Sequence, residues 1–410
     1  MCHIREYYLR KEESMLEKAI TVMQPWVEKI NELSHLKALK KAIVDLLPIF
    51  IAGCLILWIN RYIKWNDIDQ IGLLFCQVYP LFLVAAYGYH YAQEKQSSVI
   101  EIMVNDIIFM LLFRYLGNMS MQESCLIVLF FTFIFNSVFH INSKIPVIKS
   151  FFPQGAADYL HKIMLLCLNF VIMGVLIYIG LAFYPMLSLI VGGILGAVNS
   201  IYGILIVILI TVFFWSTGMH GIAFISTLLR PFWLQMLMLN MSQLLMNQSP
   251  LYIGTEPFYQ WFVWIGGSGT TLGLVMLMRC FSKSHHLRAL GKGAFKSGWV
   301  NINEEVIFGT PIVMNKLMMI PFFLTPCICV IVSYIWIAQQ PFLYPSFLSP
   351  WVFPFLLGGL ISSGGVFQIL ILLICLFIIS ILVYLPFFLC YDKQLKKSEE
   401  TGGAICTISE

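Results

Sequence analysis

The chain has 410 residues, of which 59% are hydrophobic and 11% are charged, whereas about a quarter of the residues of ordinary soluble domains are charged. Two long stretches, 163–229 and 317–391, contain no Asp, Glu, Lys or Arg. Because a helix needs about 20 apolar residues to cross a bilayer, each stretch must cross more than once. The composition excludes a soluble enzyme and predicts an all-α polytopic membrane protein, and the net charge of +4 is too small to indicate nucleic-acid binding.

Residues 1–41 form a charged segment ahead of the first apolar run, with fourteen charged side chains. A secretory signal would show a short basic region followed directly by an apolar core, so we expect the first crossing to insert as an uncleaved anchor. Apolar residues recur in this cytoplasmic segment at three- and four-residue spacing: Leu16, Ala19, Ile20, Met23, Val27, Ile30 and Leu33. This spacing predicts an amphipathic helix that lies on the membrane surface or against the protein, or a solvated helix with one apolar face.

Ten apolar segments follow and are candidate membrane crossings. They span residues 42–59, 71–92, 102–117, 124–143, 163–184, 189–214, 222–247, 258–280, 311–338 and 366–391. Two of them are weak, because 102–117 contains Asp106 and Arg114, and 222–247 contains Arg230 and follows a polar turn. The segment 222–247 could dip into the membrane without crossing it.

The distribution of Lys and Arg predicts the orientation, because cytoplasmic loops carry the basic excess. With the N-terminus inside, twenty of the 25 basic residues lie in or beside cytoplasmic segments, and two, Arg61 and Lys64, lie outside. This asymmetry predicts about ten helices with cytoplasmic N- and C-termini, and a cytoplasmic tail over residues 392–410. It leaves open that two re-entrant hairpins replace one pair of crossings.

The segment 213–221, F-F-W-S-T-G-M-H-G, interrupts an uncharged apolar region with two glycines around Met219 and His220. Such a break exposes backbone groups that need partners from the protein or from a water-filled cavity, which indicates a binding site. An ionisable side chain within a membrane is a functional candidate by default. A buried, hydrogen-bonded histidine is the alternative interpretation of His220.

The second break covers residues 301–311, N-I-N-E-E-V-I-F-G-T-P. Two adjacent carboxylates, Glu304 and Glu305, lie between a basic loop and an apolar run, and Gly309 and Pro311 prevent a continuous helix. Broken helices near the middle of the membrane commonly build the substrate site of transporters. This segment therefore predicts the lining of a polar cavity.

Three further features carry weaker signals. The loop 279–296 holds five basic residues, two histidines and no acidic residue, which indicates a topological anchor or a docking surface for an anionic cytoplasmic partner. Trp215 and Trp351 are of the residue type that stacks best on the apolar face of a sugar ring, and they hint at carbohydrate. The pair Cys327 and Cys329 lacks a nearby histidine, so we expect no metal site and no cofactor.

These motifs together resemble enzyme IIC, the membrane permease component of the bacterial phosphoenolpyruvate-dependent sugar phosphotransferase system, in its lactose/cellobiose/diacetylchitobiose family. The family signature is close to F-N-I-N-E-P-x-x-F-G-x-P-I-V-x-N-P, and residues 300–316 read V-N-I-N-E-E-V-I-F-G-T-P-I-V-M-N-K. Four further blocks of the family recur in order, at residues 214–221, at residues 266–272, at the turn around Trp351, and at residues 384–388.

The resemblance implies a homodimer in the bacterial plasma membrane. Residues 42–185 would form most of the dimer contact, and residues 186–391, with two re-entrant hairpins, would enclose and translocate the sugar. His220 and Glu304 match the catalytic positions of the family and would lie by the 6-hydroxyl of the sugar. The tryptophans would pack against the sugar rings and an asparagine would hydrogen-bond a hydroxyl, which makes the expected substrate-binding residues Trp215, Trp351, Asn303 and Asn301.

The chemistry explains why these residue types are useful. The 6-hydroxyl must attack a phosphorus atom in line, and a neutral histidine or a carboxylate can orient it and accept its proton. The resemblance implies that the phosphoryl group comes from a phosphocysteine on a separate cytoplasmic IIB protein, which is served by IIA and the general phosphocarrier proteins. We expect no IIB domain fused to this chain.

Two departures from the family signature affect the functional prediction. The family has a proline after the motif's glutamate and another after its last asparagine, whereas this chain has Glu305 and Lys316. The leading hypothesis is a permease for a β-linked disaccharide or β-glucoside that is phosphorylated by IIB. A transport-defective membrane sensor with the same fold and an ion-coupled secondary sugar carrier remain as alternatives.

Overall fold

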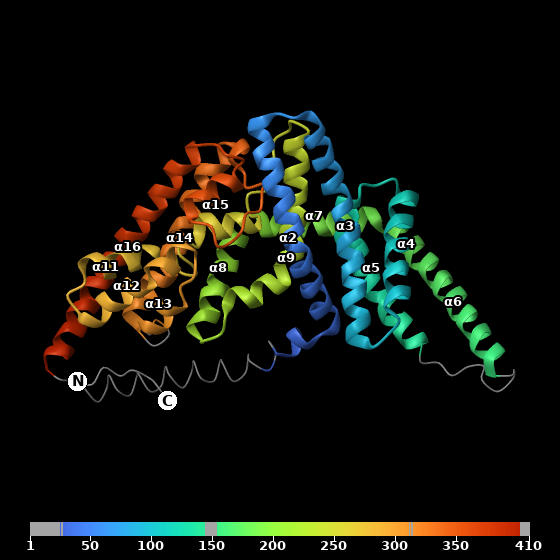
Figure 1. The fold of residues 1–410 in the computed structure, drawn as a ribbon, viewed down its shortest axis with the longest axis horizontal. Helices are drawn as coiled ribbons and strands as arrows, with labels where there is room; N and C mark the ends of the chain where they lie inside the picture. Colours follow the sequence, from blue (N-terminus) through green and yellow to red (C-terminus); the bar gives the residue numbers. More distant parts are fainter. Residues whose placement is uncertain (1–24, 26–27, 144–153, 311, 313–314, 402–410) are drawn as a thin grey trace. The chain divides into compact units, whose positions relative to one another are not determined.

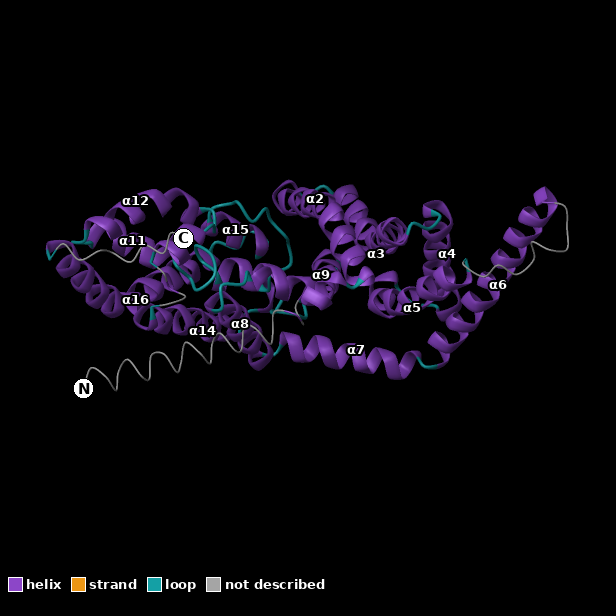
Figure 2. Ribbon diagram, turned by 90° about the horizontal axis from the view of Figure 1, so that it is seen from below, coloured by secondary structure: helices purple, strands orange, loops and turns teal. Residues whose placement is uncertain are grey.

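The structure is a computed structural model that describes residues 25, 28–143, 154–310, 312 and 315–401. Over these ranges the chain consists of helices and connecting loops and contains no strand, so the prediction of an all-α chain is confirmed (Figure 2). The elements in chain order are α2 (Ser34–Ile63), α3 (Asn66–Lys95), α4 (Val99–Gly117), α5 (Met121–Asn142), α6 (Gln154–Ala182), α7 (Tyr184–Asn199), α8 (Ile201–Ser216), α9 (Gly221–Leu245), α10 (Glu256–Phe258), the π-helical turn η1 (Tyr259–Val263), α11 (Leu272–Phe281), α12 (His285–Trp299), α13 (Glu304–Gly309), α14 (Lys316–Ala338), the 3₁₀ turn η3 (Pro341–Leu343), α15 (Phe355–Ser362) and α16 (Gln368–Glu400) (Figure 1).

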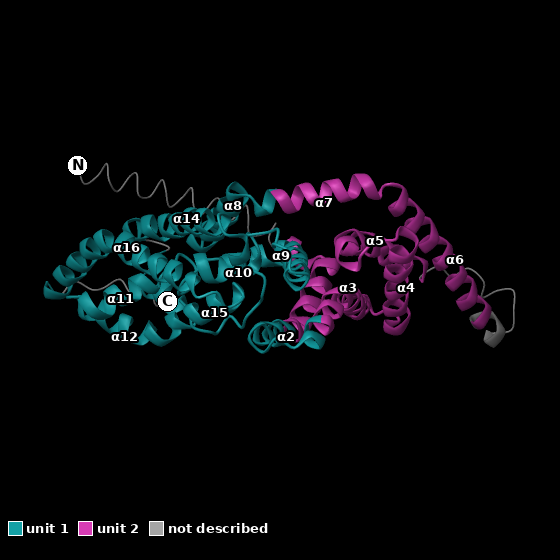
Figure 3. Ribbon diagram, turned by 90° about the horizontal axis from the view of Figure 1, so that it is seen from above, with its two compact units in different colours: residues 1–24, 51–69, 197–410 teal, residues 25–50, 70–196 magenta. Residues whose placement is uncertain are grey.

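The chain forms two compact units (Figure 3). Unit 2 consists of residues 25–50 and 70–196, and unit 1 consists of residues 51–69 and the described chain from residue 197 onward. All six predicted site residues belong to unit 1. The predicted functional division into residues 42–185 and 186–391 stays a prediction.

Seven helices of the described chain are long and apolar enough to cross a membrane, or eight if the bent pair α7 and α8 counts as one span. The seven are α2, α3, α5, α6, α9, α14 and α16. Helix α4 is not among them, in keeping with its three charged side chains, Glu101, Asp106 and Arg114. The count of ten crossings and the orientation of the termini stay predictions.

Large apolar side chains cover the outer faces of these helices. Tyr178 of α6, Leu189 of α7 and Tyr202 of α8 are 74%, 77% and 76% exposed. A soluble monomer rarely exposes large contiguous apolar patches, whereas lipid tails are as apolar as these side chains. The outer faces are therefore suited to the hydrocarbon core of a bilayer.

Aromatic side chains pack in the core of each unit. In unit 2, His35 stacks on Tyr91 with ring centroids 4.5 Å apart and shares a hydrogen bond with the hydroxyl of Tyr87 at 2.6 Å. In unit 1, Trp233 and Tyr259 are fully buried with ring centroids 4.9 Å apart. In a bilayer the hydrophobic effect does not drive helices together, so helix association depends on van der Waals packing. The bulky rings provide that packing.

The predicted segment 189–214 is bent rather than straight. Helices α7 and α8 meet at Ser200 with a bend of 68°. The hydroxyl of Ser200 caps α8 by accepting a hydrogen bond from the N–H of Gly203 at 3.0 Å. A Cβ atom at Gly203 would lie 2.0 Å from the carbonyl oxygen of Ala197. The close approach of the two helix ends therefore requires glycine.

The candidate crossing at 258–280 is not one continuous helix. The short elements α10 and η1 are followed by a loop, 264–271, before α11 begins. In this loop Gly266, Gly267 and Gly269 adopt φ angles of +77°, +97° and +78°, which L side chains rarely adopt and which interrupt a helix. The segment is two short helical pieces joined by a loop, as in a re-entrant hairpin.

Two hydrogen bonds in unit 1 together support re-entrant segments. Tyr62 and Gly365, both predicted outside, are joined by a hydrogen bond from the tyrosine hydroxyl to the glycine carbonyl at 3.2 Å. Asn301 is predicted inside and Trp351 outside, yet the side-chain amide of Asn301 donates to the carbonyl of Trp351 at 3.4 Å. The hydrocarbon core is about 30 Å thick, so residues on opposite sides of the membrane cannot touch. In the predicted orientation, at least one of the segments that carry Asn301 and Trp351 must therefore enter the membrane.

The two ends of the chain differ in what the structure describes. The predicted amphipathic helix at 16–33 lies largely outside the described residues. The predicted tail, 392–410, begins inside α16, which extends well past residue 391. On this extension the buried carboxylate of Asp392 accepts hydrogen bonds from the N–H groups of Lys283 and Ser284, each at 2.9 Å. The end of α16 therefore holds the start of α12.

Candidate functional site

The last turn of α8 and the short turn that follows it carry two predicted site residues, Trp215 and His220. Helix α9 begins directly after His220, which is its N-cap. Gly218 has a φ of +79°, and a Cβ atom at Gly221 would lie 2.1 Å from the carbonyl oxygen of Thr211. The two glycines therefore let the chain reverse and let α9 start directly against α8.

His220 faces Glu304, which is 84 residues later in the chain. The Nε2 atom of His220 lies 3.8 Å from Oε1 of Glu304, and the side chains are 52% and 46% exposed. The indole of Trp215 packs against the imidazole with ring centroids 4.5 Å apart and is itself only 3% exposed. The structure thus brings together three predicted site residues and leaves the histidine and the glutamate accessible to a ligand.

A backbone group determines which nitrogen of His220 carries the proton. The N–H of Ala223 donates to Nδ1 of His220 at 3.2 Å. A ring nitrogen that accepts a hydrogen bond carries no proton, so the neutral imidazole holds its proton on Nε2. The atom that faces Glu304 is therefore a hydrogen-bond donor, and the carboxylate is the neighbouring proton acceptor.

Glu304 is the first residue of the six-residue helix α13. Its Oε2 atom is buried and has no hydrogen-bond partner among the described residues. A buried carboxylate oxygen without a donor is costly. Glu305 follows in the same first helical turn and is exposed, where a negative charge is favoured by the helix dipole.

Asn303 supports the neighbouring loop rather than offering both polar ends to a ligand. Its side-chain NH₂ group donates to the carbonyl of Ser268 at 2.7 Å and to the hydroxyl of Thr271 at 2.9 Å. Since both amide hydrogens are engaged, the predicted hydrogen bond to a sugar hydroxyl is limited to Oδ1. A Cβ atom at Gly267 would lie 2.4 Å from Cγ of Asn303, so the loop needs glycine to pack on this side chain.

Asn301 links the same loop to the turn of Trp351. Its Oδ1 atom accepts a hydrogen bond from the N–H of Gly266 at 2.9 Å, and its Nδ2 atom donates to the carbonyl of Trp351 at 3.4 Å. The φ angle of Asn301 is +60°, a conformation that asparagine tolerates better than most residues. Trp351 is 55% exposed, so its ring is open for stacking, whereas the ring of Trp215 is not.

Helix α16 anchors the glycine-rich loop from behind, a role that the sequence analysis missed. The hydroxyl of Tyr384 donates to the carbonyl of Gly269 at 2.7 Å, and the hydroxyl of Ser380 donates to the carbonyl of Thr270 at 2.8 Å. The sequence blocks 266–272 and 384–388 are therefore two parts of one support. Their recurrence as motifs was the available signal, but nothing in the sequence indicates that they touch.

A basic surface lies on α12 and the residue before its N-cap. Glu399 of α16 accepts hydrogen bonds from the N–H groups of His285 and His286 at 3.0 and 3.1 Å and so holds the helix start. Arg288 is engaged locally, because its guanidinium donates twice to the carbonyl of Ser282 at 2.6 and 3.1 Å. The remaining exposed cations, which we call the lysine face, are Lys283, Lys292 and Lys296.

Helix α12 also touches the helix that carries Glu304. The Nε2 atom of His286 donates to the carbonyl of Gly309, the last residue of α13, at 2.9 Å. Helix α12 is thus connected through His286 to the short helix that carries Glu304. Within the described ranges, no three His, Cys, Asp or Glu side chains are grouped so that they could hold a metal ion.

The chain matches a family model and several curated relatives. The model described as "Phosphotransferase system, EIIC" matches residues 40–326. The cellobiose-specific EIIC component of Geobacillus stearothermophilus is 33% identical over 212 residues, which cover 50% of this chain and 47% of that protein. The putative permease IIC component YwbA of Bacillus subtilis is 30% identical over 295 residues, or 69% of this chain and 65% of that protein. The lichenan permease IIC component of Bacillus subtilis is 33% identical over 202 residues, or 49% and 45%.

These matches span about half to two thirds of the length of the relatives. A solved structure, of the transporter ChbC, the IIC component from the N,N′-diacetylchitobiose-specific phosphotransferase system, has a TM-score of 0.78 and covers 94% of this chain and 99% of its own, at 24% identity. That likeness establishes the fold, a multi-pass membrane protein. Since the family match covers more than two thirds of the 410 residues, the chain belongs to the EIIC family of the bacterial phosphotransferase system, whose members are integral proteins of the plasma membrane.

Proposed function

We propose that this chain is the sugar permease of a phosphoenolpyruvate-dependent phosphotransferase system. It binds and translocates a β-linked disaccharide or β-glucoside, which phospho-IIB phosphorylates at the 6-hydroxyl. The observation that supports this most directly is the 3.8 Å separation of His220 Nε2 and Glu304 Oε1 in a half-exposed site. A donor and an acceptor at this spacing are what a reacting hydroxyl group needs.

A hydroxyl oxygen fits between the two side chains. Placed about 2.8 Å from Nε2 of His220 and from Oε1 of Glu304, a usual hydrogen-bond length, it completes a triangle on the 3.8 Å separation. The hydroxyl then accepts from the imidazole N–H and donates to the carboxylate. Attack on the phosphocysteine of IIB forms the O–P bond and breaks the P–S bond, and the hydroxyl proton passes to Glu304. His220 orients the oxygen but does not take the proton, because its Nε2 is already protonated.

The relatives support the class of substrate. Two of them are named for cellobiose and lichenan, and the structural neighbour is named for N,N′-diacetylchitobiose. The exposed ring of Trp351 offers a face on which a sugar ring can stack. The test is sugar phosphorylation by membranes that contain this chain and are supplied with IIB, IIA, the general phosphocarrier proteins and phosphoenolpyruvate, with cellobiose, lactose, N,N′-diacetylchitobiose and an aryl β-glucoside as substrates.

We expect phosphorylation of at least one of these sugars at the 6-position. Binding of a sugar without phosphorylation of any would support the transport-defective sensor instead. Sugar uptake into vesicles that lack the phosphocarrier proteins would support the ion-coupled carrier. Each outcome therefore distinguishes one of the three hypotheses.

We further propose that the lysine face docks IIB. Two exposed lysines on α12, which contacts α13, and a third just before the N-cap of α12 offer positive charge close to the reacting site, and charge complementarity increases the rate of encounter. Replacing Lys283, Lys292 and Lys296 together by Gln should weaken IIB binding and reduce its salt dependence while sparing sugar binding. Unchanged IIB affinity at low salt would contradict the docking role.

The proposal includes a homodimer whose contact lies mainly in residues 42–185. In mild detergent the purified protein should have twice the chain mass of 46.9 kDa after correction for detergent. A single-chain mass at all protein concentrations would contradict this part of the proposal and leave the sugar chemistry untouched.

A further inference from the structure

Helix α13, which carries Glu304, is too short to hold its own position. It has six residues, whereas isolated helices shorter than about 12–15 residues are only marginally stable. The last carbonyl groups of any helix also lack partners within the helix. The 3.8 Å arrangement of Glu304 with His220 therefore depends on the contacts that hold the two ends of α13.

The glycine-rich loop 264–271 holds the N-terminal end of α13. The carbonyl of Asn303 accepts hydrogen bonds from the N–H groups of Val306 and Ile307, each at 3.0 Å. The side chain of Asn303 in turn donates to Ser268 and Thr271 of the loop. These bonds fix the start of the helix, and its last residue needs a separate support.

Helix α12 supports the C-terminal end of α13. The Nε2 atom of His286 donates to the carbonyl of Gly309 at 2.9 Å, so this nitrogen must carry a proton. A Cβ atom at Gly309 would lie 2.6 Å from Cδ1 of Leu290, and a Cβ atom at Gly293 would lie 3.9 Å from Oε2 of Glu305. The three α12 residues are four and three positions apart and share one face. This face of α12 therefore runs along α13 from its last residue to its first turn.

Helix α16 fixes both supports of α13. The backbone N–H of His286 donates to Glu399 of α16 at 3.1 Å, so the imidazole extends from a position that α16 holds. The hydroxyl of Tyr384, also on α16, donates to the carbonyl of Gly269 in the glycine-rich loop. The contact between His286 and Gly309 thus completes a closed set of hydrogen bonds around the helix of Glu304.

We propose that His286 is a positioning residue for sugar phosphorylation. Its hydrogen bond to Gly309 fixes α13 and keeps the carboxylate of Glu304 at the distance from His220 that the reacting hydroxyl needs. His286 neither contacts the sugar nor takes its proton. The inference rests on the proposed function. Because a displacement of about 1 Å can cost about 10²-fold in rate, loss of this hydrogen bond should lower kcat and spare affinity.

Two substitutions at His286 test the hydrogen bond. His286→Leu removes the donor but keeps a side chain of similar size with a good helix propensity, and His286→Gln keeps an N–H donor. The kcat of sugar phosphorylation is measured in reconstituted membranes at saturating sugar and phospho-IIB. In His286→Leu, kcat should fall about 10- to 10²-fold, while the KM values for sugar and for phospho-IIB change less than about twofold. His286→Gln should restore kcat to within about threefold of the wild type.

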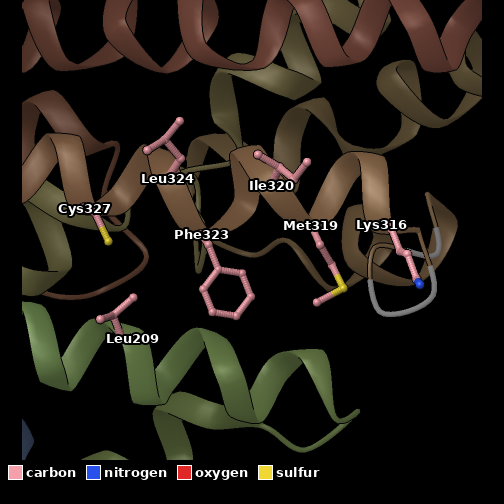
Figure 4. Close-up of a pocket in the computed structure, with 7 residues that line it drawn as sticks. All are labelled: Leu209, Lys316, Met319, Ile320, Phe323, Leu324 and Cys327. Atoms are coloured by element: carbon pink, nitrogen blue, oxygen red, sulfur yellow. The ribbon is translucent and has the colours of Figure 1, made fainter. Parts of the chain in front are cut away.

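Two control variants separate this role from general effects on the protein. His285→Leu removes an exposed imidazole from the adjacent position of α12 and should leave kcat unchanged. An apolar groove between α8 and α14 offers the second control, because Phe323 of α14 points there toward α8 (Figure 4). The residues that line this groove belong to α8 and α14. Phe323→Leu should lower the melting temperature while kcat is retained.

Two further measurements distinguish positioning from a merely structural role. If His286 acts through Glu304, adding His286→Leu to Glu304→Gln should cause no further loss of kcat, because the interaction that it supports is already gone. Hydrogen exchange of the peptide that contains α13 should be about 2- to 10-fold faster in His286→Leu, as expected for the loss of one hydrogen bond. The exchange rate should be unchanged in His286→Gln and His285→Leu.

Four outcomes would overturn the proposal. A normal kcat in His286→Leu, with an active wild type, would refute the positioning role and leave the proposed function intact. A loss confined to the KM for phospho-IIB would assign His286 to the docking surface instead. Independent losses from His286→Leu and Glu304→Gln that multiply in the double variant would show that His286 does not act through Glu304. A wild type that phosphorylates no sugar would refute the proposed function and, with it, the role of His286.

Discussion

Replacing Glu304 by Gln tests the assignment of the proton acceptor. The glutamine has the shape of the glutamate and keeps hydrogen-bonding atoms in the 3.8 Å arrangement with His220, but it cannot take up the hydroxyl proton. Loss of a general base typically slows a reaction about 10²–10⁴-fold, which corresponds to about 2.7–5.4 kcal/mol of transition-state stabilisation. We therefore expect sugar affinity to be largely retained and phosphorylation to fall by at least about 10²-fold.

Glu305→Gln is the matched control, because both glutamates lie in the first turn of α13. Each substitution removes one negative charge from the helix N-terminus and should cost a similar amount, about 0.3–1 kcal/mol. Any effect on the stability of α13 is therefore common to the two variants, and only the loss of the proton acceptor is specific to Glu304. The side chain of Glu305 is exposed, and it has no place in the proposed chemistry.

The assay has two readouts on the purified protein. Sugar binding is measured by calorimetry in detergent, and phosphorylation is measured with IIB and phosphoenolpyruvate in reconstituted membranes. If Glu305→Gln were inactive while Glu304→Gln phosphorylated sugar at the normal rate, the assignment of Glu304 would be wrong. Equal losses of phosphorylation rate in both variants would show that the effect comes from the changed charge at the N-terminus of α13 and not from the loss of a general base.

Three further substitutions test the support of the site. His220→Asn should keep α9 capped, because Asn is a preferred N-cap, so the melting temperature should be unchanged while phosphorylation falls about 10²-fold through loss of orientation of the hydroxyl; normal turnover would refute the positioning role. Gly267→Ala should destabilise the protein by about 2–5 kcal/mol in thermal unfolding, because the φ of +97° disfavours a side chain and the new Cβ would overlap the buried amide of Asn303. Gly192→Ala is the control: its new Cβ meets nothing within 4 Å, so it should be neutral or slightly stabilising. Arg230→Met should lower the free energy of unfolding of the detergent-solubilised protein by about 3–5 kcal/mol, because it leaves the largely buried carboxylate of Glu256 without the guanidinium that now binds it at 2.6 and 3.1 Å. A loss below about 1 kcal/mol would place this pair among the weak surface ion pairs.

The all-helical membrane fold could be read from composition, because uncharged stretches of 67 and 75 residues have no stable place outside a bilayer. The course of each segment could not be read in the same way. The segment 258–280 is as apolar as a crossing helix, yet three glycines in left-handed conformations break it. Those conformations depend on contacts with Asn301, Asn303 and α16, which are far away in the sequence.

The roles of individual residues divide in a similar way. The family resemblance implied that His220 and Glu304 lie together by the sugar, and the structure brings them within 3.8 Å of each other. The basic loop predicted a docking surface that included Arg288, but that guanidinium is bound to the carbonyl of Ser282 and is not freely presented. Charge counts treat all basic residues alike, whereas local hydrogen bonding decides which of them are available to a partner.

Residue types and their order were thus sufficient for the membrane class and the two breaks, because hydropathy and glycine act through local chemistry, whereas the pairing of His220 with Glu304 was implied by the family resemblance. Only the tertiary structure shows three further features. The N–H of Ala223 donates to Nδ1 of His220, so the proton of the neutral imidazole is on Nε2. Asn303 donates both amide hydrogens to the loop 264–271, and α16 donates a hydrogen bond to the same loop. Each of these features depends on the distance in space between two atoms. The number of residues between the atoms along the chain does not reveal that distance. A hydrogen bond is formed or lost over a few tenths of an ångström, and only the folded chain defines positions to that scale.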